Sequence, residues 1–156
     1  MSLELGTLAP EFTLYNTEKQ EVSSNDFKDK NLLILFFPLA FTGVCTTELC
    51  TIRDDIANYQ NLNTEVVGIS VDSLFVLEKF KAEQNINFNL LSDFNKTAAS
   101  AFGVLYDEFP AFGMKGVSKR AAFIVDKAGK IAYAEVCATP GDLPNFDAIK
   151  TTLSEL

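Results

Sequence analysis

Uninterrupted apolar runs are the clearest feature of the hydrophobic pattern along this chain. Two of them, Asn31–Phe37 and Thr64–Val71, have the length and composition of strands that are covered on both faces. Phe88–Leu91 predicts a third, shorter strand of the same kind. From Pro10 to Val22 apolar and polar residues alternate instead, which predicts a short N-terminal hairpin. A second antiparallel hairpin is predicted for Arg120–Asp126 and Ile131–Val136, around the turn at residues 127–130.

Helical periodicity marks the segments between these strands. From Cys45 to about Asn61 the apolar residues recur at intervals of 4, 3, 4 and 3, which predicts one helix with a single buried stripe. Ser73 is a candidate N-cap for the next helix, whose stripe is Leu74, Leu77 and Phe80. A short helix over Lys96–Phe102, closed by Gly103, and a last helix carrying Phe146, Ile149 and Leu153 complete the pattern.

The resulting order is β-α-β-α-β-α-β-β-α after the N-terminal hairpin. Parallel βαβ units followed by a hairpin predict an α/β fold with a central mixed sheet and helices on both faces. Ligand chemistry in such folds gathers beyond the carboxyl ends of the strands. The loop Pro38–Val44 and the start of the Cys45 helix are expected to lie there.

Composition and charge narrow the class of protein. A chain of 156 residues, 47% of them apolar, is expected to form one domain over residues 1–156. A net charge of −8 disfavours nucleic acid and anionic membranes as partners, because both require clustered Lys and Arg. The first residues lack the basic and apolar regions of a secretory signal, so we expect a cytoplasmic protein.

The cysteines are the candidate chemical groups. There are three, Cys45, Cys50 and Cys137, and such an odd number does not suggest a disulfide framework. The chain has no histidine, which excludes Cys-His dyads, Ser-His-Asp triads and most zinc sites. Any reactive thiolate must therefore be stabilised by something other than an imidazolium.

Cys45 stands where a reactive thiol would be expected, at the start of its predicted helix. Free backbone N–H groups and the helix dipole favour an anion at such a position, and the thiolate is the nucleophilic form of cysteine. Pro38 ends the preceding strand, and the Thr42 hydroxyl can donate to a sulfur or to a bound oxygen. Two plainer roles stay open: Cys45 as one member of the buried stripe, and Thr42 as an N-cap.

Arg120 and Glu48 are candidate partners of the thiol. Arg120 is one of two arginines and opens an otherwise apolar strand, where a charge is excluded unless it is paired. A guanidinium beside a thiolate would stabilise it and offer donors to a bound oxygen, although an ordinary ion pair at the strand end is the alternative. Glu48, in the first turn after Cys45, either favours the helix dipole or bonds Arg120.

These residues carry a resemblance to a known family. The segment from Pro38 to Cys45 (PLAFTGVC) resembles the active-site motif of peroxiredoxins, with Pro38, Thr42 and Cys45 at the motif's spacing. Glu48 and Arg120 also match positions of that family, and the similarity extends over nearly the whole chain. The resemblance implies a thioredoxin-like fold and reduction of peroxides through a Cys45 sulfenic acid, without a metal or organic cofactor. It also implies an external thiol reductant (thioredoxin, glutaredoxin or a low-molecular-weight thiol) and a homodimer.

The other two cysteines bear on which subgroup of peroxiredoxins the chain resembles. The Cys-x4-Cys spacing of Cys45 and Cys50 resembles the bacterioferritin-comigratory subgroup, in which Cys50 would be the resolving residue. On an intact helix their Cα atoms would be roughly 8–9 Å apart, which is too far for a disulfide, so the first turns would have to unwind. The PLAFTG segment resembles instead the alkyl-hydroperoxidase-E subgroup, whose one-cysteine members use an outside thiol. Cys50 thus stays either resolving or structural, and Cys137 is expected to be structural.

An apolar loop precedes Arg120. Its members are Phe109, Pro110, Phe112 and Met114. They predict a pocket wall, a dimer face or simple packing beneath the domain.

Overall fold

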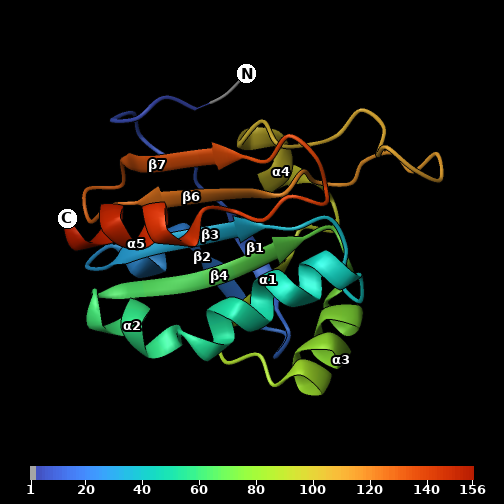
Figure 1. Cartoon of the computed structure of the whole chain (residues 1–156), viewed down its shortest axis with the longest axis horizontal. Helices are drawn as coiled ribbons and strands as arrows, with labels where there is room; N and C mark the ends of the chain where they lie inside the picture. Colours follow the sequence, from blue (N-terminus) through green and yellow to red (C-terminus); the bar gives the residue numbers. More distant parts are fainter. Residues whose placement is uncertain (1–2) are drawn as a thin grey trace.

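A mixed β-sheet forms the centre of the computed structural model, which describes residues 3–156 (Figure 1). Within these residues the seven strands run in the order β2-β1-β5-β4-β3-β6-β7. The strands are β1 (Thr13–Asn16), β2 (Glu21–Ser23), β3 (Asn31–Phe36), β4 (Thr64–Ser70), β5 (Asn89–Ser92), β6 (Ala121–Val125) and β7 (Ile131–Val136). The three central strands β3, β4 and β5 are parallel, and every other neighbouring pair is antiparallel. Both predicted hairpins and the mixed sheet are confirmed.

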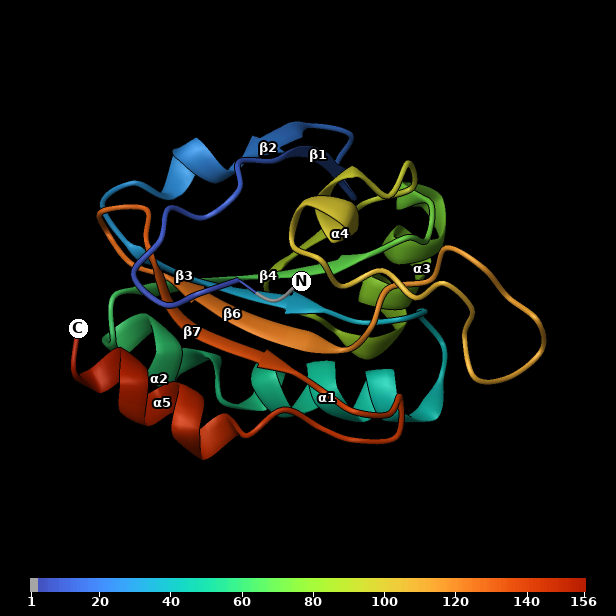
Figure 2. The same cartoon turned by 90° about the horizontal axis from the view of Figure 1, so that it is seen from above.

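Helices cover both faces of this sheet. They are α1 (Gly43–Asp54), α2 (Ile56–Asn61), α3 (Leu74–Gln84), α4 (Thr97–Ala101) and α5 (Phe146–Ser154), with a 3-10 turn η1 at Ser24–Phe27. Figure 2 shows α1, α2 and α5 on one side of strands β3, β6 and β7, and α4 on the other side. In the described part of the chain, no helix is long and apolar enough to cross a membrane.

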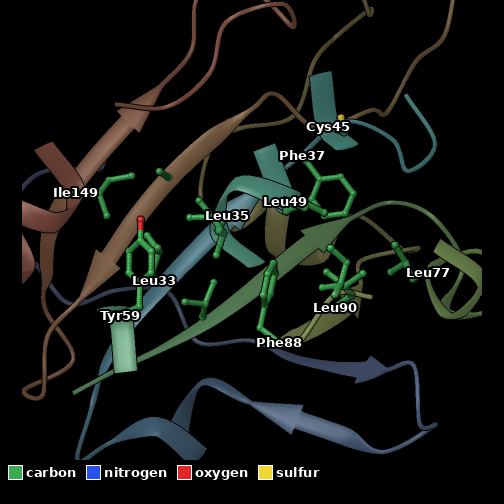
Figure 3. Close-up of a cluster of buried hydrophobic side chains, with 14 of the residues drawn as sticks. Leu33, Leu35, Phe37, Cys45, Leu49, Tyr59, Leu77, Phe88, Leu90 and Ile149 are labelled. Carbon is green, nitrogen blue, oxygen red and sulfur yellow. The ribbon is translucent and has the colours of Figure 1, made fainter. Parts of the chain in front are cut away.

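The strand β3 separates two apolar cores, which explains its continuous hydrophobic run. All six of its residues are buried. Leu33 and Leu35 join the core beneath α1, which also includes Leu49 and Cys45 (Figure 3). The alternate residues, such as Phe36, join the second core under α4. A strand buried on both faces needs apolar side chains at every position, not at every second one.

The long helix predicted from Cys45 to Asn61 is divided in two. The backbone of Asp55 leaves the helical region (φ −114°, ψ 10°), and α2 begins after it. The Asp55 carboxylate accepts a 2.8 Å bond from Lys150 on α5, which holds it at the break. The apolar stripe continues across the break, so its periodicity did not reveal the division.

Register brings separate parts of the chain to one edge of the sheet. Phe36 at the end of β3 pairs with Ala121 at the start of β6, and Ala121 pairs with Val136 at the end of β7. Phe36 also lies opposite Ile69, near the carboxyl end of β4. The residues after β3, β4 and β7 and the residues before β6 therefore meet at the edge where α1 begins. This is expected for a site beyond the carboxyl ends of parallel strands.

Candidate active site

Cys45 lies in the first turn of α1, which places its sulfur at the positive end of the helix dipole. Thr42 is the N-cap residue, with extended backbone angles, and Cys45 is the third residue of the helix. Its side chain is fully buried and belongs to the core that contains Leu49 and Phe37. Cys45 thus belongs to the buried stripe and also lies at the start of a helix.

Arg120 connects Cys45 to Glu48. One guanidinium nitrogen, Nη2, donates to Cys45 Sγ at 3.3 Å, and Nη1 donates to Glu48 Oε1 at 2.8 Å. Nη2 also donates to the carbonyl oxygen of Pro140 at 2.9 Å. Arg120 lies one residue before β6, so the strand directs its side chain across the end of the sheet toward α1. The predicted contact between guanidinium and sulfur is present, and the acidic partner of Arg120 is Glu48.

This ion pair is removed from water. Glu48 is 0% exposed and Arg120 is 2% exposed. Burial raises the pKa of Glu48 to about 7, against the opposing effect of the Arg120 charge. Burial also disfavours the Arg120 charge, but the Glu48 carboxylate and the Cys45 sulfur outweigh this effect and raise the Arg120 pKa above its ordinary value. The guanidinium therefore remains charged, while Glu48 exchanges its proton close to neutral pH.

Two polar atoms of this pair remain available. Within residues 3–156, neither Glu48 Oε2 nor Arg120 Nε has a hydrogen-bond partner, although both are buried. Buried polar atoms are nearly always paired in folded proteins, because an unpaired one costs about 1–3 kcal/mol. Unpaired atoms at a reactive cysteine are consistent with a site prepared to bind a small polar molecule.

Thr42 and Pro38 lie in the loop between β3 and α1. The Thr42 hydroxyl is exposed and donates to the carbonyl oxygen of Leu39 at 2.8 Å, and it does not cap α1. Pro38 is buried directly after the strand. The preceding carbonyl, of Phe37, accepts a 3.1 Å bond from the buried hydroxyl of Ser118, which fixes the point where the chain leaves the sheet. Pro38 thus lies on the buried side of the loop that leads to Cys45, and Thr42 lies on its exposed side.

Asp72 anchors this loop and was not identified from the sequence. Its Oδ2 accepts from the backbone N–H of Ala40 at 2.8 Å and from the Ser70 hydroxyl at 2.7 Å. The available signal was a carboxylate two residues beyond a buried parallel strand, at the edge where sites form. The Pro140 carbonyl was also missed, because no sequence pattern identifies a backbone acceptor.

Cys50 and Cys137 occupy different surroundings, and all three cysteines are free thiols. Cys50 is half-buried on α1, with its Sγ 3.5 Å from Gln84 Oε1 of α3. Cys137 is buried just after β7, and its backbone N–H donates to the carbonyl of Arg120 at 2.9 Å. Burial raises the pKa of the Cys137 thiol to about 11, with additional contributions from the Glu135 and Glu48 carboxylates. The cysteine expected to be structural therefore lies beside the site.

The apolar loop before Arg120 projects from the molecule near this edge (Figure 2). Phe112 is 90% exposed and Pro110 is exposed, whereas Phe109 and Met114 are half-buried. Phe109 packs edge-on against Tyr106, with ring centroids 5.7 Å apart. Phe112 thus does not form a pocket wall or pack beneath the domain.

No residues suited to a metal cluster accompany the thiol. Within residues 3–156, no three His, Cys, Asp or Glu side chains gather closely enough to hold a metal ion. The groups that contact Cys45 are instead a guanidinium and apolar side chains. A guanidinium at this position offers hydrogen-bond donors to the sulfur and to an oxygen that approaches it.

Comparison with known proteins identifies the family of this chain. Residues 5–134 match the AhpC/TSA family. Alkyl hydroperoxide reductase E of Mycobacterium tuberculosis is 34% identical over 144 residues, covering 90% of each chain. The putative peroxiredoxin bcp of Coxiella burnetii is 37% identical over 134 residues, covering 85% of this chain and 87% of that protein.

Solved structures show the same fold. A peroxiredoxin-like protein from Aquifex aeolicus superposes with a TM-score of 0.89 at 30% identity, over 99% of this chain and 88% of its own. Peroxidoxin BcpB of Mycobacterium tuberculosis has a TM-score of 0.86 at 24% identity, over 99% and 98%. The fold and these relatives define a thiol-dependent peroxidase with a thioredoxin-like architecture. The chain belongs to the AhpC/TSA family and is a peroxiredoxin.

Proposed function

We propose that Cys45 is the residue that reduces the peroxide. The observation that carries this proposal is the 3.3 Å bond from Arg120 Nη2 to the buried Cys45 Sγ at the start of α1. The thiolate attacks one peroxide oxygen, and the O–O bond breaks as the S–O bond forms. Cys45 becomes a sulfenic acid, and the leaving oxygen takes up a proton as an alcohol or water.

Arg120 and the backbone supply the donors for this step. The N–H groups in the first turn of a helix have no partner within the helix, so those of Val44 and Cys45 are suited to a peroxide oxygen. The Arg120 guanidinium stabilises the charge on the leaving oxygen. Glu48 orients the guanidinium through the 2.8 Å bond to Nη1 and is a positioning residue.

Thr42 and Pro38 complete the proposed substrate site. Thr42 Oγ1 donates to Leu39 at present and can turn to donate to a bound peroxide, because it lies on the exposed side of the loop. Pro38 is buried and shields the thiolate from water. Since Cys45 is itself fully buried, entry of a substrate requires a small outward movement of the loop.

The substrates that we propose are hydrogen peroxide and organic hydroperoxides. Support comes from the peroxiredoxin family and from the relative named alkyl hydroperoxide reductase E. A second thiol must then reduce the sulfenic acid. Cys50 or an outside thiol could supply it, and the outside reductant would be thioredoxin, glutaredoxin or a low-molecular-weight thiol acting in the cytoplasm. Cys50 would have to leave its contact with Gln84 and unwind α1 to reach Cys45.

We also propose a homodimer that uses the projecting apolar loop. The support is Phe112, whose side chain is 90% exposed at the tip of that loop. Burying a Phe side chain contributes about 1.5–3 kcal/mol, which favours a contact between copies. Sedimentation of the wild type and Phe112→Asp tests this: the variant should shift toward monomer, and an unchanged dimer would show that the loop is not the interface.

The proposed chemistry is tested by mixing reduced protein with one equivalent of hydrogen peroxide and following peroxide loss. Cys45→Ser should abolish the fast phase, because serine lacks a nucleophile of comparable reactivity at neutral pH. Thr51→Ala on the same helix is the control, since Thr51 is exposed and bonds only the Thr47 carbonyl. An unchanged rate in Cys45→Ser would refute the proposal.

A further inference from the structure

Cys137 was expected to be structural, but the sheet register places it at the active site. Ala121 pairs with Val136 in the antiparallel β6–β7 ladder, so one step further along Arg120 lies opposite Cys137. The 2.9 Å bond from the Cys137 N–H to the Arg120 carbonyl confirms this extra pair. Side chains that lie directly opposite in an antiparallel pair project to the same face of the sheet. Cys137 therefore shares a face with the Arg120 guanidinium and with Cys45, to which that guanidinium bonds.

The charges around Cys137 confirm this placement. The Glu48 carboxylate and the Arg120 guanidinium both act on its thiol, so Cys137 is within electrostatic range of the two groups that surround Cys45. The raised pKa of Cys137 keeps it a protonated thiol at neutral pH, and a protonated thiol does not compete with Cys45 for peroxide. Cys137 thus shares a face of the sheet with Cys45 and stays protonated at neutral pH.

The chain after Cys137 connects the two cysteines physically. The Pro140 carbonyl accepts from Arg120 Nη2, the same nitrogen that donates to Cys45 Sγ. The segment between β7 and α5 is irregular, and residues 138, 139 and 141–143 are exposed. A loop of this kind can move without breaking a helix or a strand. Cys50 lacks this freedom, because it lies within α1, the helix whose start activates Cys45.

We infer that Cys137 is the resolving cysteine, which attacks the Cys45 sulfenic acid to form a disulfide within one chain. The inference rests on the proposed function, because that reaction supplies the sulfenic acid. The Cys137 sulfur bonds to the Cys45 sulfur, the S–O bond breaks, and hydroxide leaves. The proton of the Cys137 thiol passes to that hydroxide and gives water, so the atoms balance with no further oxidant.

The step requires a local rearrangement at the site. A disulfide needs Cα atoms about 4.4–6.8 Å apart, and the guanidinium now lies against the Cys45 sulfur. Conversion of the thiolate to a neutral sulfenic acid removes the negative charge that holds Arg120 there. The bond from Nη2 to Cys45 then weakens, which frees the Cys45 sulfur to turn toward the exposed loop that follows Cys137.

Tryptic digestion distinguishes the possible disulfides directly. Cleavage after Lys30 and Arg53 leaves Cys45 and Cys50 in one peptide, residues 31–53, whereas Cys137 lies in residues 131–150. Reduced wild-type protein is treated with one equivalent of hydrogen peroxide, its remaining thiols are alkylated, and the digest is weighed without reduction. We expect peptide 31–53 joined to peptide 131–150, with two of the three thiols lost. Reduction should separate the pair.

Two variants assign the bond. Cys50→Ser should give the same joined peptides, which identifies Cys45 as the partner of Cys137. Cys137→Ser should give no joined peptides and should leave a Cys45 sulfenic acid that dimedone traps. If Cys137→Ser does not fold, the wild type and Cys50→Ser still decide the matter.

Several results would overturn the inference. They are a disulfide inside peptide 31–53, a persistent sulfenic acid in the wild type, and joined peptides found only in the dimer band of a non-reducing gel. In each of these cases peroxide is still consumed at Cys45, and the proposed function stands. If the wild type consumes no peroxide and Cys45 remains a free thiol, the proposed function itself has failed.

Discussion

Glu48 and Arg120 form a buried ion pair whose geometry suits reactivity better than stability. Removing two charges from water is costly, and a buried pair repays this cost only if its remaining polar atoms are also bonded. Here Glu48 Oε2 and Arg120 Nε have no partner among residues 3–156. The Arg120 charge also faces two acidic groups, Glu48 and Cys45, at 2.8 and 3.3 Å. Burial raises the pKa of Glu48 to about 7, because the nearby Arg120 charge offsets only part of the cost of removing the carboxylate from water.

The proton on Glu48 makes the stability of the reduced protein depend on pH. The folded protein releases this proton near a pKa of about 7, whereas the unfolded chain releases it near the model-peptide value of 4.5. Between these values the folded state binds more protons, so the free energy of unfolding decreases as pH rises through that window. Glu48→Gln keeps an acceptor for Arg120 but cannot titrate. We expect it to reduce this decrease, by about 1.4 kcal/mol for each unit by which burial separates the two pKa values.

Urea denaturation of the reduced proteins at about pH 5 and about pH 8 measures the effect. Glu65→Gln is the control, because Glu65 is half-exposed and pairs only with the exposed Lys30. Its stability should show the same dependence on pH as the wild type. Equal dependence in all three proteins would mean that Glu48 is ionised throughout this range.

The connection from β3 to α1 determines where the Cys45 sulfur lies. The strand β3 ends at Phe36. Thr42 lies six residues further along the chain, and α1 begins directly after it. Within that loop Phe41 adopts a left-handed backbone (φ 66°), and its ring packs edge-on against Phe80 of α3 at 5.2 Å. The Asp72 carboxylate holds the loop from the other side through Ala40. A non-glycine residue with positive φ persists only where its surroundings determine it, and here they do.

Removal of the Asp72 carboxylate should therefore slow the reaction of Cys45 with peroxide. Asp72→Ala leaves the Ala40 N–H and the Ser70 hydroxyl without their acceptor. The loop should lose its fixed position, and we expect the rate of the first turnover to decrease by about tenfold, the equivalent of about 1.4 kcal/mol. The measurement is single-turnover peroxide consumption by the reduced variant.

The neighbouring residue provides the control. Ser73 caps α3 by accepting from the Val76 N–H at 3.2 Å, and its hydroxyl has no hydrogen bond to the loop among residues 3–156. Ser73→Ala should reduce the free energy of unfolding by about 1 kcal/mol, as for other caps, and keep the rate of the wild type. If both variants lose rate equally, the loss reflects general destabilisation and Asp72 is not a positioning residue.

At the scale of the whole molecule, close packing of the sheet against α1 keeps the site in place. Gly68 lies in the middle of β4, between β3 and β5. A Cβ at this position would lie 2.8 Å from Leu90 Cδ2, 3.3 Å from Phe37 Cε1 and 3.7 Å from Leu49 Cδ2. These three side chains belong to the core that includes Cys45 (Figure 3). A larger residue at this position would therefore displace a neighbouring core side chain.

Gly68→Ala should destabilise the protein by about 1–3 kcal/mol, because the added methyl group forces neighbouring core side chains out of position. Gly43→Ala is the matched control for stability. A Cβ at Gly43 meets nothing within 4 Å, and alanine favours a helix. Thermal or urea denaturation of the two variants distinguishes these cases. Comparable stabilities would show that the core accommodates the methyl group.

The predictions from sequence succeeded where the controlling interactions are local. The buried strand β3 was recognised because it is apolar at every position after Asn31, as expected of a strand covered on both faces. The cap of α3 by Ser73 was recognised because capping involves residues three apart. The prediction of one helix from Cys45 to Asn61 was wrong, since the break at Asp55 is held by Lys150 of α5. That contact joins residues far apart in the chain.

The sequence by itself determined the order of the strands, the order of the helices apart from the break at Asp55, the position of Cys45 at a helix start, and the choice of Glu48 and Arg120 as its candidate partners. Each of these follows from side-chain periodicity, from residue type or from resemblance to a family. Only the tertiary structure decided that the guanidinium reaches a sulfur 75 residues away, and that Cys137 lies opposite Arg120 on the same face. Such contacts depend on the register between strands, and the pairing of distant segments sets that register.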